Sequence, residues 1–219
     1  MLVSKVLLGR GVKVSNIKYT GSKGAIGYFE GKSNIGISKG VIMTSGYADY
    51  AKGPNNMKGK SKNNNLPGYT ELTKISGNPT HDASILEFDF IPEADTVKFN
   101  YVFASEEYPF FPKLTGDKGY VGTTMNDCFA FFVSGPNPSG GNYSNFNVAL
   151  IPETNLPVTI NNVNNVPPYN KYEQYYVDNS PGDSSLQYNG FTVSFSAIIP
   201  VVPCQTYHII LAIADAGDY

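Results

Sequence analysis

The sequence predicts an all-β protein, built as a two-sheet antiparallel β-sandwich that is jelly-roll-like, with long loops and little helix. Apolar and polar residues alternate along several short runs, and turn-forming residues separate these runs, with 22 glycines and 15 prolines in the chain. Alternation places one face of each strand in a core, and two packed sheets bury those faces. The 219 residues suffice for one sizeable core, so we predict a single domain over residues 1–219.

The strands and loops follow from the same pattern. The runs at 85–91 and 97–103 are separated by a short turn and predict a hairpin. The run at 128–133 is apolar almost throughout, which is typical of a central strand covered on both faces. A short helix is expected only within 66–77, whereas the polar segments 53–66 and 161–188 are expected to be loops. Further strands are predicted at 12–19, 40–45, 191–199 and 207–213.

Composition disfavours two classes of partner. The formal net charge is -2, and the lysines and arginines form no cluster that would bind nucleic acid or hold a membrane surface. No apolar run approaches the roughly 18 residues of a membrane span. We therefore expect neither nucleic-acid binding nor membrane insertion. The N-terminus lacks the basic region of a signal peptide, so an exported protein would have its targeting segment outside this chain.

Acidic and amide side chains mark three predicted strand ends. Two adjacent carboxylates stand in the segment FASEEYPFF at 103–111. Calcium takes six to eight oxygen ligands, and loops at one end of a sandwich can supply them. Capping of turns by the same side chains is the alternative. Zinc is disfavoured because the two histidines are not spaced as a ligand pair. The sequence predicts a calcium site formed by Glu106, Glu107, Asn126, Asp127, Asp215 and Asp218.

The residues around the acidic pair suggest binding more than catalysis. Neighbouring side chains on a strand point to opposite faces, so Glu106 and Glu107 cannot together flank one glycosidic bond. A pairing of one of them with Asp127 keeps a glycoside hydrolase-like enzyme as a lesser alternative, and no catalytic motif is present. We expect a protein that is not an enzyme. The aromatic residues Tyr108, Phe110 and Phe111 would form a ligand platform if exposed, and part of the core if buried.

The two cysteines, Cys128 and Cys204, allow two interpretations. A disulfide between them would persist in an extracellular protein. A pair of buried free thiols is the alternative.

Several blocks of the sequence resemble one family. LLGRGVKVSNIKYTG, NIGISKGVIMTSG, YVFASEEYPFF, MNDCFAFFVSGP and VVPCQTYHIILAIADAGD occur in the order found in the choice-of-anchor L domain, a bacterial module of secreted and adhesin-like proteins. The resemblance implies an extracellular or cell-surface location, with an anchor segment that lies outside this chain. Such domains usually continue beyond the AGD block, so this chain is expected to lack its last C-terminal strand and to leave a sheet edge open.

Composition and resemblance together predict an adhesion module that binds an extracellular glycan or peptide without catalysis. Tyrosine offers a flat apolar face with a polar tip, and asparagine both donates and accepts hydrogen bonds. The alternative is a structural subunit of an extracellular fibre or sheath, in which neighbouring copies exchange strands at the open edge.

Overall fold

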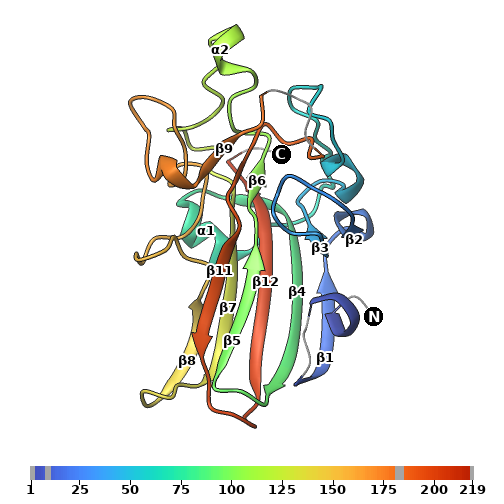
Figure 1. Cartoon of the computed structure of the whole chain (residues 1–219), viewed down its shortest axis with the longest axis vertical. Coiled ribbons are helices and arrows are strands. Elements are labelled where there is room, and N and C mark those ends of the chain that lie inside the picture. The colour runs from blue at the N-terminus through green and yellow to red at the C-terminus, as the bar shows by residue number, and fades with distance from the viewer. Residues whose placement is uncertain (1–2, 8–10, 181–184, 218–219) are drawn as a thin grey trace.

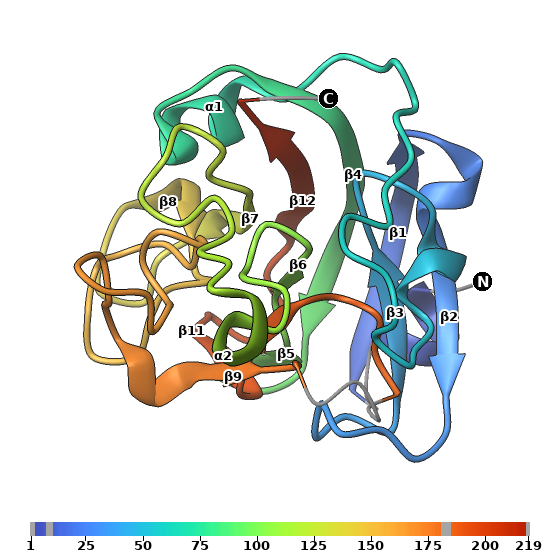
Figure 2. The same ribbon diagram turned by 90° about the horizontal axis from the view of Figure 1, so that it is seen from above.

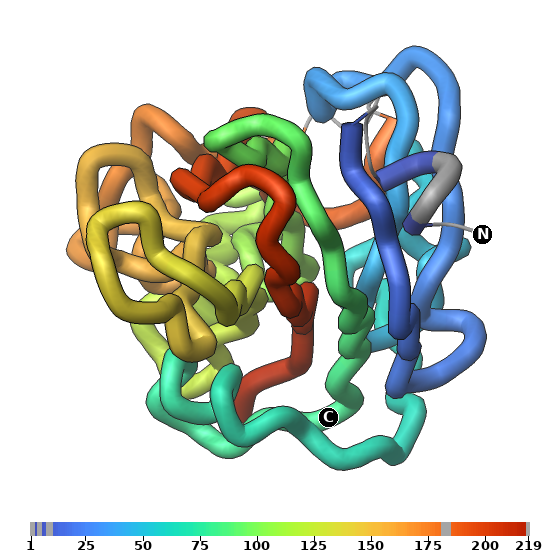
Figure 3. Tube along the Cα trace, turned by 90° about the horizontal axis from the view of Figure 1, so that it is seen from below, coloured from blue at the N-terminus to red at the C-terminus, as the bar shows by residue number. Residues whose placement is uncertain are grey.

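A five-stranded antiparallel sheet forms the frame of the protein, in a computed structural model that describes residues 3–7, 11–180 and 185–217. The strand order is β1-β4-β12-β7-β8, which is visible from the side in Figure 1 and from below in Figure 3. Every neighbouring pair in this order is antiparallel. The strands are β1 (Val12–Thr20), β4 (Thr80–Pro92), β12 (Tyr207–Ala216), β7 (Cys128–Pro136) and β8 (Asn142–Asn147).

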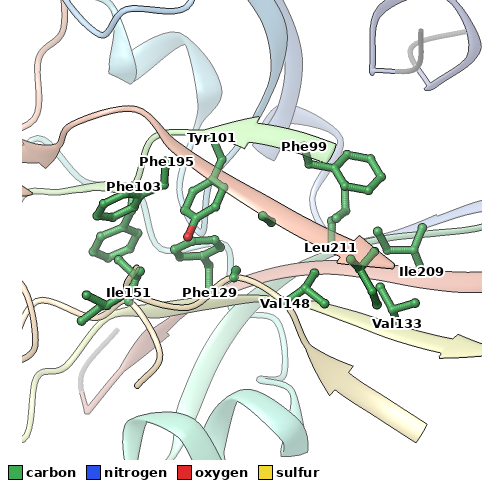
Figure 4. Packing of buried hydrophobic residues seen from close by; sticks show 14 of the residues in the cluster. Phe99, Tyr101, Phe103, Phe129, Val133, Val148, Ile151, Phe195, Ile209 and Leu211 are labelled. Atoms are coloured by element: carbon green, nitrogen blue, oxygen red, sulfur yellow. The ribbon is translucent and has the colours of Figure 1, made fainter. Parts of the chain in front are cut away.

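A ribbon of two strands, β5 (Thr96–Tyr101) and β11 (Phe195–Pro200), lies over one face of the large sheet (Figure 1). Aromatic side chains fill the space between the two layers (Figure 4). The rings of Phe103 and Phe129 stack with centroids 5.4 Å apart, and Tyr101 meets Phe131 edge-on at 5.2 Å. The prediction of an antiparallel β protein is confirmed, but the second layer is a ribbon with irregular segments and not a second sheet of comparable width.

The predicted hairpin of residues 85–91 and 97–103 is wrong. β4 pairs with β1 and β12, whereas β5 pairs with β11. After Pro92 the chain leaves the large sheet and enters the ribbon, so that Phe88 and Phe99 point into one core from opposite layers. Alternation of apolar residues fixes which face of a strand is buried, but it does not fix which strand is the neighbour.

The other face of the large sheet is covered by α1 (Thr70–Ser76), within the predicted range for a helix. Leu72 is 0% exposed and packs against a patch that includes four alanines, which leave room for the helix. β7 is therefore covered on both faces, as its apolar sequence predicts. The apolar partners of Leu72 in this second cluster are Ala83, Cys128, Ala130, Phe132, Ala212 and Ala214.

Small elements complete the fold and agree with the expectation of little helix. β2 (Ile26–Glu30) and β3 (Lys39–Met43) form a hairpin, and β6 (Ala104–Ser105), β10 (Gly190–Thr192) and β9 (Tyr176–Asp178) form a three-stranded sheet. None of the helices within the described ranges is long and apolar enough to cross a membrane. The short helical segments are η1 (Val3–Leu7), η2 (Lys23–Ala25), η3 (Ala48–Ala51), α2 (Pro112–Thr115) and η4 (Glu173–Tyr175).

The cysteines are free and not bridged, and only one of them is buried, so the disulfide is wrong and the pair of buried free thiols is right only for Cys128. Cys128 is buried at the start of β7, and Cys204 is exposed in the turn that precedes β12. Cys128 lies opposite Ala214, near the far end of β12. The two thiols are thus roughly 20 Å apart along the strand, at about 3.3 Å per residue. A disulfide needs Cα atoms within about 7 Å.

The edges of the large sheet are β1 and β8, and both are irregular. β12, the last described strand, is paired on both sides and is therefore not an edge of the sheet. The register of β1 shifts between Ser15 and Lys18, where Asn16 has φ 52°. In β8, Asn145 has φ 46° at another shift of register. Such bulges twist an edge and disfavour the docking of a further strand.

Candidate functional site

Three of the predicted strand ends meet at one end of the protein, which Figure 2 shows from above. Glu106 and Glu107 follow β6, Asp127 precedes β7, and Asp215 stands near the end of β12. Because Cys128 pairs with Ala214, the antiparallel register brings Asp127 and Asp215 into the same region. The acidic residues that come together from distant parts of the sequence are Glu107, Asp127 and Asp215, since the charges of Asp215 and Glu107 act on Asp127.

Asp127 is the most enclosed of these acids. The residue is half-buried, but surrounding protein encloses its carboxylate, which accepts hydrogen bonds from the Ser105 hydroxyl at 2.9 Å and from the Ala216 N–H at 3.2 Å. Burial raises the pKa of Asp127 well above its ordinary value, and the charges of Asp215 and Glu107 raise it further. The native environment therefore favours a proton or a cation at this group.

Asp215 links the end of β12 to the segment that follows β3. The Ser45 hydroxyl donates a hydrogen bond of 2.6 Å to Oδ1 of Asp215. The Tyr188 hydroxyl lies nearby and donates to Oγ1 of Thr44 at 3.2 Å. Burial raises the pKa of Tyr188 to about 12, and the charges of Glu106, Asp215 and Asp127 act in the same direction. Tyr188 is therefore close enough to be affected by the charge of Glu106 and by the Asp127 cluster, which we define as Glu107, Asp127 and Asp215.

Glu106 and Glu107 lie in the turn that follows β6 and not on a strand as the sequence suggested, and Glu106 is not among the charges that raise the pKa of Asp127. Both of its carboxylate oxygens are buried and form no hydrogen bond of normal geometry. Burial raises the pKa of Glu106 to about 7, although the Gln187 side chain and the N–H groups of Lys60 and Gly59 lie close enough to oppose part of this rise. The backbone oxygen of Glu106 accepts a hydrogen bond of 2.6 Å from the Asn189 side chain.

The remaining two residues of the predicted calcium site are Asn126 and Asp218. Asn126 is 8% exposed, and its side chain donates to the Ser76 carbonyl at 3.3 Å and accepts from the Asn161 N–H at 3.1 Å. Both amide atoms thus help to hold the end of α1 and the loop at 161, and the role of Asn126 as a ligand stays a prediction. Asp218 lies outside the described residues.

The acids do not form a finished metal cage. Across residues 3–7, 11–180 and 185–217, no group of three or more His, Cys, Asp or Glu side chains is arranged to hold a metal ion. Glu107 and Asp215 are near enough to raise the pKa of Asp127. A cation at this cluster would therefore take part of its ligands from backbone carbonyls, hydroxyls or water.

The aromatic residues of the acidic segment divide between core and surface. Tyr108 is 0% exposed, and its hydroxyl donates to the Val163 carbonyl at 2.7 Å, so it belongs to the core and cannot contact an external ligand. Phe110 and Phe111 are half-buried, with ring centroids 4.5 Å apart. They precede α2, which projects from the end of the molecule in Figure 1 and carries Leu114 with 84% exposure.

Sequence reasoning missed a set of buried amides beside the acids. The Gln187 side chain donates to Oδ1 of Asn55 at 3.1 Å and to the Met57 carbonyl at 2.9 Å, and Asn55 donates to Oδ1 of Asn189 at 3.3 Å. These residues come from two polar segments that composition assigns to exposed loops. No local pattern indicates their burial, because the partners are more than 100 residues apart.

The family model of the choice-of-anchor L domain matches residues 1–219, the whole chain. The chain belongs to the choice-of-anchor L domain family. Domains of this family are typical of secreted and surface proteins of bacteria, which agrees with the resemblance of the sequence blocks. Among curated proteins and solved structures, none matches this choice-of-anchor L domain significantly.

Proposed function

We propose that this choice-of-anchor L domain is a non-catalytic adhesion module in which calcium binds at Glu107, Asp127 and Asp215. The observation that carries the calcium proposal is the enclosed Asp127 carboxylate, whose pKa two further carboxylates raise. Removing a charge from water costs several kcal/mol per ion unless an opposite charge offsets it. A divalent cation offsets that cost.

The ligand chemistry of the cluster suits a hard cation. Calcium accepts carboxylates in mono- or bidentate form, and it fills the remaining positions with carbonyl, hydroxyl or water oxygens at about 2.3–2.6 Å. The hydroxyls of Ser45 and Ser105 already contact Asp215 and Asp127. Binding would require the carboxylates to move closer together. A proton shared among the acids is the competing arrangement, and it predicts no response to calcium.

Calcium titration tests this proposal directly. Chelator-treated protein is titrated with calcium by calorimetry, and its melting temperature is measured with and without calcium. We expect heat and a rise in melting temperature for the wild type, and loss of the binding event assigned to this cluster in Asp127→Asn and Asp215→Asn. The exposed Glu93→Gln serves as the matched control. An unchanged calcium response in both Asn variants would refute the site.

The adhesive role rests on the projecting loop. Asp117 braces this loop because it accepts the Phe110 N–H at 3.0 Å and forms a salt bridge of 2.9 Å with Lys58. A braced loop with an exposed Leu114 loses little conformational freedom when it binds a partner. Glycan and peptide arrays, run with and without calcium, should show binding that Leu114→Ser weakens. Absence of binding on both arrays, together with growth of particle size at higher protein concentration, would instead favour the fibre subunit.

A further inference from the structure

Two tyrosine rings and two lysine ammonium groups come together on the surface around η3. Tyr47 precedes η3 and Tyr50 lies within it, and the centroids of their rings are 5.6 Å apart. The Lys62 ammonium group lies over the Tyr47 ring, 5.9 Å from its centroid, and the Lys60 ammonium group lies over the Tyr50 ring at 5.5 Å. Tyr47 is 37% exposed and Lys62 is exposed, so this tyrosine-lysine patch of four residues is open to solvent.

The segment that carries the two lysines is anchored on both sides of them. On one side, Lys58 forms its salt bridge of 2.9 Å with Asp117. On the other side, the Asn64 side chain donates to the carbonyls of Ser45 at 2.6 Å and Gly46 at 3.1 Å, directly before the tyrosines. The lysines are therefore held beside the rings before any ligand arrives. A surface that is ordered in advance loses less conformational entropy when it binds.

The positive charge of the patch is not balanced by a salt bridge. Within residues 3–7, 11–180 and 185–217, neither Lys60 nor Lys62 forms an ion pair with a carboxylate, whereas Lys58 does. The charge of Lys60 acts on Glu106, but the carboxylate oxygens of that residue are buried. Residues 44–65 contain four lysines, and Asp49 is their only acid. The patch therefore offers two ammonium groups to an anion from outside.

The neighbouring rings narrow the chemistry of that anion. A cation–π contact at an exposed site is weaker than a hydrogen bond between two charged groups, so an anionic group can draw the ammonium groups toward itself. The tyrosine rings then present flat apolar faces with polar tips. A pyranose ring has an apolar face of C–H bonds and can carry a carboxylate or a sulfate at its rim. An acidic sugar therefore matches both the lysines and the tyrosines.

We propose that the tyrosine-lysine patch binds an acidic glycan, whose sugar rings carry carboxylate or sulfate groups. Other anionic partners match fewer of these features. Clusters that hold an anionic membrane contain about four to eight lysines or arginines, and the patch has two. Single-stranded nucleic acid requires a positively charged groove along its backbone, whereas the net charge of this chain is -2. An acidic peptide would use the lysines and leave the rings without a role.

This proposal rests on the proposed function only in that the domain binds an extracellular ligand. It requires neither calcium nor the projecting loop with Leu114. Binding is therefore measured in the presence of chelator, which also prevents calcium from cross-linking an acidic polymer.

Matched pairs of polysaccharides test the proposal by biolayer interferometry. The acidic probes are polygalacturonic acid and dextran sulfate, and their uncharged counterparts are the methyl ester of polygalacturonic acid and dextran. We expect binding to an acidic polymer and not to its counterpart, and the pair that shows it tells carboxylate from sulfate. The double variant Lys60→Gln/Lys62→Gln should weaken binding about tenfold. Lys98→Gln is the matched control, because Lys98 is an exposed lysine of β5 that has no salt bridge within the described residues.

Two further variants separate the parts played by charge, ring and fold. Lys60→Arg/Lys62→Arg keeps both charges and should retain binding, whereas Tyr47→Ala keeps the net charge and should weaken it. Circular dichroism confirms that each variant is folded. Polyglutamate, an acidic peptide without sugar rings, should bind more weakly than the acidic polysaccharide.

Several results would overturn the acidic-glycan site. One is failure of the wild type to bind either acidic polysaccharide, and another is unchanged affinity in the double glutamine variant. Equal binding of polyglutamate, together with no effect of Tyr47→Ala, would replace the glycan with an acidic peptide. Tighter binding to single-stranded DNA or to phosphatidylserine vesicles would likewise exclude a glycan as the preferred partner. The calcium titration of Asp127→Asn has a separate readout, so either proposal can fail without the other.

Discussion

Replacing Glu106 with glutamine is expected to stabilise the cation-free protein at neutral and alkaline pH. The pKa of Glu106 rises from 4.5 to about 7 on folding, chiefly because the carboxyl group is buried. At about 1.36 kcal/mol for each pH unit, the ionised group costs at most about 3 kcal/mol. Because part of Glu106 remains open to solvent screening, we expect a gain of about 1–3 kcal/mol in the free energy of unfolding.

The pKa values of Glu106 in the unfolded and folded states determine how the free energy of unfolding changes with pH. Below pH 4.5 both the folded and the unfolded state hold the proton, so Glu106 does not change stability with pH. Between pH 4.5 and about 7 only the folded state holds it, and the free energy of unfolding falls as the pH rises. Above about pH 7 Glu106 is ionised in both states, and it no longer changes the free energy of unfolding as the pH rises. Glu106→Gln removes this decline, so the advantage of the variant appears only as the pH rises through that window.

Urea unfolding in the presence of chelator measures the difference. Curves for the wild type, Glu106→Gln and the exposed control Glu93→Gln are recorded from pH 4 to 8.5 by far-ultraviolet circular dichroism. Other acids, such as Asp127, contribute equally to all three proteins and cancel in the comparison. If wild type and Glu106→Gln remain parallel across this range, the buried-charge argument is wrong.

Three further predictions concern the frame of the protein. Leu72→Ala removes the only leucine of α1 from a fully buried position and should cost about 2–5 kcal/mol in urea unfolding, whereas a cost below about 1 kcal/mol would mean that the helix is not packed on the sheet. Tyr207→Phe leaves the Val202 N–H without its acceptor, 2.7 Å away, and should cost about 1–3 kcal/mol by the same measurement, with a neutral result contradicting that hydrogen bond. A thiol reagent should label Cys204 quickly in the native protein and Cys128 only after unfolding, and slow labelling of both would contradict the exposed turn.

The sequence predicts local structure well because alternation reports burial. Each strand of the large sheet other than β8 overlaps a predicted run, and the helix at 70–76 falls within its predicted range. Alternation does not predict which strands pair, since the partner of β5 is β11, about a hundred residues away. The same limit applies to the site. Acidic residues at strand ends could be predicted, whereas the buried amides of Asn55 and Gln187 come from polar segments with no periodic signal.

The turn after β6 places two adjacent carboxylates in different surroundings. Glu106 and Glu107 both follow Ser105 in this turn, where the Gln187 side chain acts on the pKa of Glu106 and the charge of Glu107 acts on the pKa of Asp127. β6 pairs with β10, whose Gly190 has no room for a side chain because Tyr108 and Tyr176 lie against it. The short strand that precedes the two carboxylates is therefore fixed by the packing of its partner strand against tyrosine rings. A cation bound by Glu107, Asp127 and Asp215 would then act on a rigid support, and its binding energy would go into ordering the attached loops and not into moving the strand.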